Sequence, residues 1–517
     1  MTLEPFPDHH ATITPQKPAL TMSGSGETVT FAQLAERSQR AANLLRARGI
    51  GPGDTIAILL ENHPRFLEIA WAAQRAGLRY TAVSSRLTGD EVAYILADSG
   101  ARALFTSDQS IDAASGATSS VTSVEHLITV DAATEGFEPY VELIASQPAA
   151  PLEDEGEGTD MLYSSGTTGR PKGVEANLSL APLGTPPGAV ALLQSLYAFD
   201  TDSVYLCPAP LYHAAPLRFT MVAQRFGGTA VVMERFDPLE ALRLIERHQV
   251  THVQMVPTMF IRMLKLPEEQ RRSCDLSSLQ TVIHAAAPCP PEVKAQMIEW
   301  LGPIVHEYYS STEAYLLTAI KPEEAVAHPG SVGRPLLGTP HILDDEGQEL
   351  PIGVPGTIWS EGGLDFTYRN DPDKTAGARN AHGWATVGDI GYLDDEGYLY
   401  LTDRKADMII AGGVNVYPQE AENVLVTHAE VADAAVFGIP HAELGEEVKA
   451  VVQPLSLEDA GAELEARLLA FCHERLARYK CPRSIDFEAE LPRQPTGKLY
   501  KRLLRDRYAR QAGVEAT

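Results

Sequence analysis

The chain has 517 residues, which at roughly 100–200 residues per domain is enough for two to four domains. Hydrophobic residues make up 44% of the chain and charged residues 21%, a balance that is typical of a globular protein and excludes a disordered or fibrous chain. The 42 Lys and Arg residues stand against 69 Asp and Glu residues, and the formal net charge of −27 excludes nucleic acid as a general partner. The same charge repels polyanions, so a nucleotide site must supply its own phosphate-binding groups.

The cysteines and the N-terminal segment indicate the compartment. The five cysteines are an odd number and form no C-x-x-C pair, so they indicate neither a zinc knuckle nor a disulfide framework. A reducing compartment fits this usage. The first residues lack a basic segment followed by an apolar one, and no apolar run reaches about 18 residues. We therefore predict a cytoplasmic protein without integral membrane association.

Helical and strand-like segments alternate along the chain, which predicts α/β architecture. Apolar spacing predicts helices at residues 31–48, 66–76 and 238–248, and strands at 55–60, 103–106, 230–233 and 252–256. Two stretches, 110–123 and 146–160, are poor in apolar residues, and we expect them to be solvated loops.

The pattern of predicted elements changes towards the C-terminus. Residues 389–402 read as two strands around an Asp-Glu-Gly turn, and about 110 residues of mixed strand and helix follow. We place a domain boundary near Arg404, so that an N-terminal domain covers residues 1–403 and a C-terminal domain residues 404–517.

The densest motif is Y-S-S-G-T-T-G-R-P-K-G at residues 163–173. Its glycines permit positive φ and close backbone approach, its amides and hydroxyls can donate to phosphate oxygens, and Lys172 adds a positive charge. The motif is not a Walker A loop, because Pro171 lies where the second glycine should be and Gly173 where Ser or Thr is required. The composition therefore predicts a phosphate-binding loop of another kind.

Further motifs follow this loop in an order that resembles the adenylate-forming enzymes, which include acyl-CoA synthetases, luciferases and peptide-synthetase adenylation domains. The segments Y-S-S-T-E at 309–313, G-W-A-T-V-G-D at 383–389, D-R at 403–404, G-G-V-N-V-Y-P at 412–418 and P-T-G-K at 495–498 carry the resemblance. It extends over nearly the whole chain.

The resemblance implies a fold and a set of cofactors. The fold is an α/β protein with a large N-terminal domain of α/β subdomains plus a β-barrel-like part, and a small mobile α+β C-terminal domain. The implied reaction joins a small-molecule carboxylic acid to CoA with ATP and Mg²⁺. Assembly as a homodimer stays open.

Physical chemistry gives each implied site residue a role. Glu313 suits Mg²⁺, a hard cation that accepts few protein carboxylates and keeps its waters. Thr312 offers a hydroxyl to the α-phosphate, and Asp389 is an acceptor for the two ribose hydroxyls. Arg404 can donate to ribose oxygens. By the resemblance Lys498 is the catalytic lysine that bridges the carboxylate and the α-phosphate.

The resemblance and the loop composition together give three sets of residues. The implied catalytic residues are Lys498, Thr312, Glu313 and His213. The implied ATP-binding residues are Ser164, Ser165, Gly166, Thr167, Thr168, Lys172, Ala286, Glu307, Tyr308, Tyr309, Thr312, Asp389, Arg404 and Lys498. The implied acyl pocket consists of Tyr212, His213, Ala285, Tyr308 and Ser310.

Two positions depart from the family pattern. Ala406 occupies the hinge position, where Asp or Lys is usual, and alanine can still absorb a change in φ and ψ. Ser310 stands where glycine is common and where the acetate-specific branch carries a tryptophan plug. Serine leaves that space open, which favours an acid larger than acetate. The segments at 308–313 and 413–418 resemble those of bacterial ligases for fatty, steroid or terpenoid acids. A peptide-synthetase substrate is disfavoured because, apart from Glu307, no acidic residue lies in the pocket segments.

CoA is inferred as the acceptor of the acyl group from two glycines. Gly412 and Gly413 resemble the edge of the pantetheine tunnel, where only glycine lets a chain pass close to the backbone. A basic stretch at 501–510 either meets CoA phosphates or is a solvated helix face. The leading hypothesis is an ATP-dependent acid–CoA ligase. The alternatives are an adenylating enzyme that loads a carrier protein or works as luciferases do, and a non-catalytic nucleotide-binding regulator.

Overall fold

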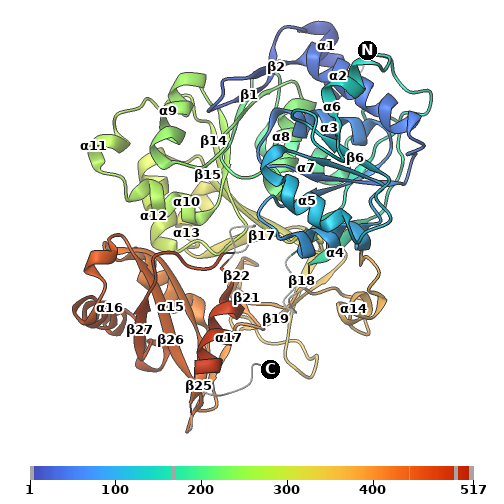
Figure 1. Ribbon diagram of the computed structural model, residues 1–517. Coiled ribbons are helices and arrows are strands. Elements are labelled where there is room, and N and C mark those ends of the chain that lie inside the picture. Colours follow the sequence, from blue (N-terminus) through green and yellow to red (C-terminus); the bar gives the residue numbers. More distant parts are fainter. Residues whose placement is uncertain (1–4, 165–170, 442, 494–498, 512–517) are drawn as a thin grey trace. The chain divides into compact units, whose positions relative to one another are not determined.

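The computed structural model describes residues 5–164, 171–441, 443–493 and 499–511, shown as coloured ribbon in Figure 1. The chain divides into two compact units. Unit 1 consists of Met1–Gln254, Arg272–Val282 and Asp365–Thr375, and unit 2 of Met255–Arg271, Ile283–Leu364 and Ala376–Thr517. Each unit is therefore built from chain segments that are far apart in the sequence.

Unit 1 contains a six-stranded parallel sheet in the order β7-β6-β5-β3-β4-β8. Every residue of β3 and β5 is buried, as expected for a parallel sheet with both faces covered. The strands are β3 (Thr55–Leu59), β4 (Arg79–Val83), β5 (Ala103–Thr106), β6 (His126–Thr129), β7 (Glu138–Pro139) and β8 (Thr159–Asp160). The helices of the unit are α1 (Pro7–Ile13), α2 (Phe31–Ala47), α3 (Pro64–Arg75), α4 (Gly89–Ser99), α5 (Ile111–Thr118), α6 (Tyr140–Ala145), α7 (Gly188–Tyr197), α8 (Ala214–Arg225) and α9 (Pro238–His248).

Two further groups of strands complete unit 1. β2 (Thr28–Thr30), β1 (Pro18–Met22), β12 (Thr229–Val232), β11 (Val204–Cys207) and β13 (His252–Met255) are neighbours in that order. β9 (Leu162–Ser164), β10 (Lys172–Ala176) and β20 (Phe366–Tyr368) form a separate antiparallel sheet. β20 comes from a part of the chain about 190 residues after β10, and α14 (Pro372–Gly377) follows it.

Local signals account for the ends of the predicted helices, which the structure confirms. α2 begins after Thr30, whose side chain accepts from the Gln33 amide while the Gln33 side chain accepts from the Thr30 amide. It ends before Gly49, which has a positive φ of 74°. α9 begins after Asp237, whose carboxylate accepts from the Glu240 amide, and has Pro238 at its first position.

The expectation of solvated loops at 110–123 and 146–160 is wrong for parts of both stretches. The first contains α5, which lies beside α4 in Figure 1 and buries Ala114 and Ala117. The two helices approach each other at Gly116 and Gly89, since a Cβ built on Gly116 would be in van der Waals contact with the Gly89 Cα at 3.9 Å. The second contains Glu157, which is only 2% exposed.

Glu157 forms a buried ion pair with Arg225. The guanidinium of Arg225 donates to both carboxylate oxygens at 2.8 and 2.9 Å, and it lies over the rings of Phe6 and Trp71. Gln74 also donates to the Glu157 carboxylate. The pair therefore joins α3, α8 and the segment before β8 through charges that are removed from water.

Unit 2 contains an antiparallel sheet in which β18, β19, β21, β22, β17, β16 and β15 are neighbours in that order. Their bounds are β15 (Val305–Ser310), β16 (Leu317–Ile320), β17 (Ser331–Leu337), β18 (Thr339–Leu343), β19 (Gly356–Glu361), β21 (Asp389–Leu393) and β22 (Leu399–Arg404). β21 and β22 form the predicted hairpin. Within the described residues β18 pairs only with β19, so the part expected to be barrel-like is an open sheet and not a closed barrel.

Three register shifts interrupt this sheet, and glycines occupy two of them. The shifts lie between Leu317 and Thr318, between Ser331 and Gly333, and between Ile390 and Gly391. A Cβ on Gly333, whose φ is 95°, would lie 1.9 Å from the carbonyl oxygen of Ala319, so no other residue fits there. Such irregularities bend a strand and increase its twist.

The C-terminal part of unit 2 has its own sheet, with β24, β23, β26 and β25 in that order and β27 parallel to β26. α15 and α17 both pack on β25. The strands are β23 (Ile409–Ala411), β24 (Val414–Val416), β25 (Val431–His441), β26 (Gly445–Pro454) and β27 (Ser484–Phe487). The helices of unit 2 are α10 (Pro257–Leu264), α11 (Glu268–Arg271), α12 (Pro291–Leu301), α13 (Pro322–Ala327), α15 (Pro418–Thr427), α16 (Ala462–Arg475) and α17 (Lys501–Gln511). The predicted boundary near Arg404 coincides with the end of β22, and the division into domains 1–403 and 404–517 stays a prediction.

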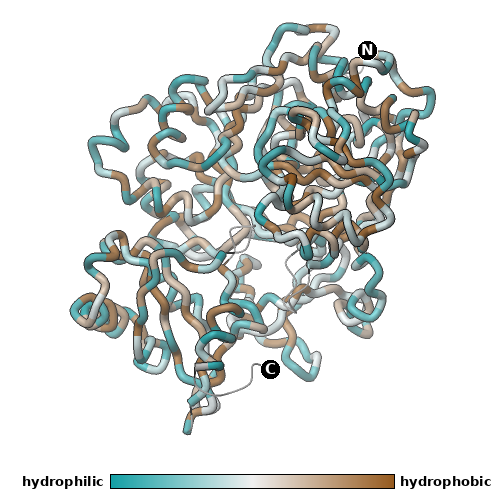
Figure 2. Tube along the Cα trace, in the orientation of Figure 1, coloured by the Kyte–Doolittle hydropathy of each residue, from teal (hydrophilic) through white to brown (hydrophobic). Residues whose placement is uncertain are grey.

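Figure 2 shows the apolar character of the chain as brown stretches separated by teal loops and outer helix faces. None of the helices in the described ranges combines the length and the apolar character that a membrane span requires.

We expect Glu157→Ala to lower the free energy of unfolding by about 3–5 kcal/mol, because it leaves the buried guanidinium of Arg225 without a counter-charge. Urea unfolding followed by circular dichroism measures this loss. The matched control is Glu36→Ala, which breaks the exposed helical pair with Arg40 and should cost less than about 1 kcal/mol. Equal losses in the two variants would contradict a structural role for the buried pair.

Candidate functional site

Asp389, Arg404 and Tyr309 meet in unit 2 and form the centre of the candidate site. Asp389 begins β21 and Arg404 ends β22, and the two residues are paired across the hairpin. The hydroxyl of Tyr309, from β15, donates to Asp389 Oδ2 at 2.6 Å, and Arg404 Nε lies 3.3 Å from Asp389 Oδ1. An ionised carboxylate has about four lone-pair sites, so Asp389 keeps acceptor capacity for two ribose hydroxyls.

Burial and charge set the protonation states of this cluster. Burial raises the pKa of Tyr309 well above its ordinary value, and the nearby Asp389 carboxylate adds to the shift. Burial opposes the charge on Arg404, but the carboxylates of Asp389 and Asp407 raise its pKa overall. The tyrosine therefore stays a neutral donor and the arginine a cation, and both lie within reach of the Asp389 carboxylate oxygens.

Sequence reasoning missed Tyr315, which completes the cluster. Its hydroxyl lies 2.8 Å from the hydroxyl of Tyr309, and its side chain is fully buried. Burial and the charge of Asp389 raise its pKa well above the ordinary value. A tyrosine two residues after Glu313 was the only signal for it, and that signal is too common to single the residue out.

Thr312 and Glu313 lie in the turn that follows β15. Ala314 closes the turn with a positive φ of 50°, and its amide donates to the Ser311 carbonyl at 3.1 Å. Glu313 is 8% exposed, and its charge adds to the rise in the pKa of Tyr315 and of Arg404. A single carboxylate beside the cluster of Asp389, Arg404 and Tyr309 fits Mg²⁺, which is usually held by one or two carboxylates together with substrate phosphates. No group of three or more His, Cys, Asp or Glu side chains suited to a metal occurs in the described part of the chain.

The segment that contains Ala286, one of the implied ATP-binding residues, follows β14 (Thr281–His284). Ala285 is 4% exposed, whereas Ala286 is exposed and has a positive φ of 75°. Since an alanine rarely adopts this conformation, the backbone at Ala286 is strained. Strained backbone of this kind is often found in ligand-binding segments, and contact of Ala286 with ATP stays a prediction.

Glu307 is placed in a buried ion pair that sequence reasoning did not foresee. Its carboxylate contacts the ammonium of Lys294 on α12, and Lys294 also donates to the Ser331 carbonyl at 3.0 Å. Burial raises the pKa of Glu307 although the Lys294 charge opposes that shift. The fully buried His284 lies 3.7 Å from the same carboxylate, and burial lowers its pKa well below the ordinary value. These contacts anchor β15, whose next residues are the half-buried Tyr308 and Tyr309.

Part of the predicted site lies outside the described residues. This part consists of five predicted residues, namely Ser165, Gly166, Thr167 and Thr168 of the predicted phosphate loop and the catalytic candidate Lys498. The two described ends of the loop, Ser164 and Lys172, are paired across β9 and β10 in unit 1. Lys172 Nζ lies 5.0 Å from the centre of the Tyr368 ring.

The predicted acyl-pocket residues fall in both units. In unit 1, Tyr212 is 7% exposed, and its ring meets that of His213 edge-on with centroids 4.5 Å apart. His213 is the residue before α8. In unit 2, Ser310 ends β15, and its hydroxyl donates to the Leu316 carbonyl at 2.9 Å.

Gly412 and Gly413 form the turn between β23 and β24 and have positive φ values of 61° and 79°. The turn geometry itself requires glycine at both positions, independently of any tunnel. The hinge candidate Ala406 is exposed, and Arg505 of α17 donates to its carbonyl at 3.0 Å. The roles of these residues in the tunnel and the hinge stay predictions.

The basic stretch at 501–510 is largely balanced by acidic neighbours. Lys501 pairs with the buried Glu422 at 2.9 Å, and Arg507 contacts Glu488. Burial raises the pKa of Glu422 to about 7. These pairs give α17 a structural role beside any contact with CoA.

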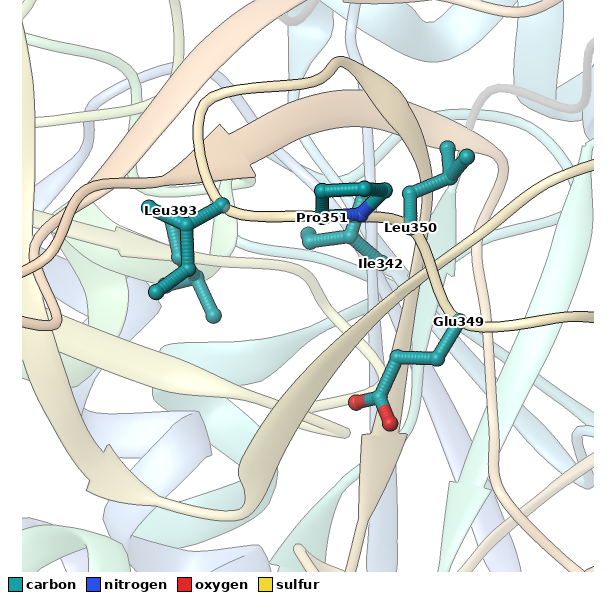
Figure 3. A pocket seen from close by; sticks show the side chains of 6 residues that line it. Ile342, Glu349, Leu350, Pro351 and Leu393 are labelled. Carbon is teal, nitrogen blue, oxygen red and sulfur yellow. The ribbon is translucent and has the colours of Figure 1, made fainter.

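A hollow on the surface of unit 2 is distinct from these residues (Figure 3). It is lined by Ile342, Glu349, Leu350, Pro351, Ile352 and Leu393. Its lining is mostly apolar, with one carboxylate and no cation, so it does not suit a nucleotide phosphate. None of the predicted site residues lines it.

Comparisons with known proteins decide the family. The AMP-binding enzyme family matches residues 7–364, and the AMP-binding enzyme C-terminal domain matches residues 420–498. The chain belongs to the AMP-binding enzyme family. This family member is an adenylate-forming enzyme of the acid–CoA ligase type, which uses ATP, Mg²⁺ and CoA.

Relatives of this AMP-binding enzyme cover it from end to end. It is 35% identical to a feruloyl-CoA synthase of an Amycolatopsis species, over 97% of this chain and 98% of that protein. It is 34% identical to the indoleacetate–CoA ligase of Aromatoleum aromaticum, over 100% of both. The solved structure of o-succinylbenzoate CoA synthetase from Bacillus subtilis with its acyl-adenylate intermediate matches with a TM-score of 0.81 and 29% identity, over 97% of each chain. The predicted α/β fold with a large and a smaller part is thereby confirmed.

We expect Asp389→Ala to weaken ATP binding by about ten- to a hundredfold, because a hydrogen bond to a charged partner is worth about 1–3 kcal/mol. Titration calorimetry with ATP and Mg²⁺ measures the change. Glu396→Ala, on the exposed turn of the same hairpin, is the matched control and should bind ATP as the unmodified protein does. Unchanged affinity in Asp389→Ala would place this carboxylate outside the nucleotide site.

Proposed function

We propose that this enzyme joins a medium-to-large hydrophobic carboxylic acid, including acids with fused rings, to CoA in two half-reactions. In the first, an oxygen of the acid attacks the α-phosphorus of ATP and pyrophosphate leaves. In the second, the thiol of CoA attacks the carbonyl carbon of the acyl-adenylate and AMP leaves. The observation that carries the proposal is the Asp389 carboxylate, held between Tyr309 and Arg404 with acceptor capacity for a ribose.

The chemistry explains the groups around this carboxylate. ATP and a carboxylate bring two anions together, so the site needs cations and donors aimed at the charge that develops on the α-phosphate. In this proposal Lys172 and Lys498 supply the cations, Thr312 a hydroxyl, and Glu313 a ligand for Mg²⁺. Lys498 is assigned by its place in the P-T-G-K motif.

The size of the acid is inferred from Ser310. Its hydroxyl turns back to the Leu316 carbonyl, so the side chain adds little bulk beyond its own strand. Tyr212 and His213 offer aromatic faces to an apolar acid. Two relatives are named for feruloyl and indoleacetate, so aromatic acids belong with fatty and polycyclic acids among the candidates.

The acceptor, the moving part and the location complete the proposal. Free CoA accepts the acyl group and passes the turn at Gly412 and Gly413. The C-terminal domain, residues 404–517, rotates about Ala406 between the half-reactions. The five free cysteines support a cytoplasmic location, because a reducing compartment leaves cysteines unpaired.

A panel of acids tests the function directly. The enzyme is incubated with ATP, Mg²⁺ and CoA and with fatty, cinnamic-type, indolic, steroid and short-chain acids in turn. AMP together with a thioester supports the proposal. AMP formation that does not consume CoA favours an enzyme that loads a carrier protein, and the absence of both products favours a nucleotide-binding regulator.

We expect Ser310→Trp to shift activity from the best large acid towards short acids, because the indole fills space that serine leaves open. The ratio of kcat/KM for the large acid to that for acetate measures the shift. Ser310→Ala, which adds no bulk, is the control. Full activity of the tryptophan variant on the large acid would mean that position 310 does not line the pocket.

We expect Lys498→Ala to reduce acid-dependent pyrophosphate release by at least about 10²–10³, the usual effect of removing a group that stabilises developing charge. The same variant, supplied with a chemically prepared acyl-adenylate and CoA, should form thioester at nearly the unmodified rate, because the rotated domain carries Lys498 away from that step. Rapid-quench assays measure both half-reactions. Equal losses in the two would mean that they share one conformation.

A further inference from the structure

The phosphate loop begins and ends on a hairpin whose two faces differ. β9 and β10 pair Ser164 with Lys172, and one step further Tyr163 with Gly173. Side chains opposite each other in an antiparallel pair lie on the same face, and the next pair lies on the other face. Ser164 and Lys172 therefore share one face, and Tyr163 and Gly173 share the opposite one.

The ring of Tyr163 lies directly over Gly173. A Cβ built on Gly173 would be 3.0 Å from Tyr163 Cζ and 3.1 Å from its hydroxyl oxygen, closer than side chains normally approach. The Tyr163 hydroxyl donates to Asp98 Oδ2 at 2.6 Å. Burial and then this carboxylate raise the pKa of Tyr163, so the hydroxyl keeps its proton and the hydrogen bond.

Asp98 is itself held in place by residues that follow β20. It lies in the last turn of α4, and its backbone carbonyl accepts from Arg369 Nε at 3.0 Å and from Asn370 Nδ2 at 2.9 Å. Asn370 Nδ2 also lies 3.2 Å from Asp98 Oδ1. Donors at a helix C-terminus satisfy carbonyls that have no partner within the helix.

The same segment returns to the hairpin. The Arg369 amide donates to the Gly173 carbonyl at 2.9 Å, and its guanidinium contacts Glu175 at 3.2 Å. These contacts form a closed ring of residues within unit 1. Asp98 contacts Tyr163, and the Tyr163 ring lies over Gly173. Gly173 is hydrogen-bonded to Arg369, which in turn is hydrogen-bonded to Asp98. A closed ring of contacts restrains both β9 and β10 at the ends of the loop.

We propose that Asp98 is a positioning residue, which through Tyr163 holds Ser164 and Lys172 in the geometry that binds the phosphates of ATP. The inference rests on the proposed function of the hairpin. Phosphate contacts depend on placement within about 0.5 Å, and the hydrogen bond from the residue next to Ser164 supplies that restraint.

The test is Tyr163→Phe, which removes only the hydroxyl. ATP with Mg²⁺ should bind about three- to tenfold more weakly in titration calorimetry, and KM for ATP should rise by a similar factor while KM for the acid changes less than about twofold. Thioester formation from a prepared acyl-adenylate should stay within about twofold, because that step no longer involves the β- and γ-phosphates. Tyr400→Phe, which deletes a similar tyrosine-to-aspartate contact in unit 2, is the matched control and should leave all these values unchanged.

A double-mutant cycle separates positioning from general damage. Asp98→Ala should weaken ATP binding at least as much as Tyr163→Phe, and adding Tyr163→Phe to it should cause less than about a twofold further loss, since both remove one bond. Unchanged ATP affinity, independent losses in the two variants, or equal losses in both half-reactions would overturn the proposal. The binding measurement needs no acid, so an unmodified protein that binds ATP but forms no thioester would refute the proposed function alone.

Discussion

The hydrogen bond between Tyr309 and Asp389 constrains the shape of the sheet in unit 2. Tyr309 lies on β15 and Asp389 on β21, and four strand-to-strand steps separate these strands in the order of the sheet. Neighbouring strands lie about 4.8 Å apart, so on a flat sheet the two residues would be about 19 Å apart. The hydroxyl and the carboxylate are nevertheless 2.6 Å apart. The sheet must therefore curl, and the contact between Tyr309 and Asp389 exists only because it does.

The curl has identifiable causes in the sequence. One register shift lies at Gly333 on β17, between the two ends of the curl, and another at Gly391 on β21, the strand that carries Asp389. A Cβ on Gly391 would lie 2.3 Å from the Tyr400 carbonyl oxygen. Bulged, glycine-containing positions increase strand twist without joining the edges. The expectation of a barrel-like part and the finding of an open sheet are reconciled in this way, since the curvature is present and the closure is not.

Local patterns predicted many elements and only part of the site. α9 and β5 begin and end where apolar spacing and caps place them, because those signals lie within a few residues of the element. α5 could not be predicted in this way, since it packs through small residues and has no wide apolar face. Tyr315 and Lys294 were missed because their roles depend on partners from other strands and helices. Motif order placed Asp389 and Arg404 among the candidates, whereas their contact with each other and with Tyr309 is visible only in the fold.

The origin of β20 has a consequence for the newly made chain. β10 is complete by residue 176, but its partner strand and the residues that hold α4 come from positions 366–370. A ribosome that adds about 5–20 residues per second needs at least about ten seconds to make the intervening segment. During that interval the edge of β10 lacks its partner strand and is open to pairing with other extended chains.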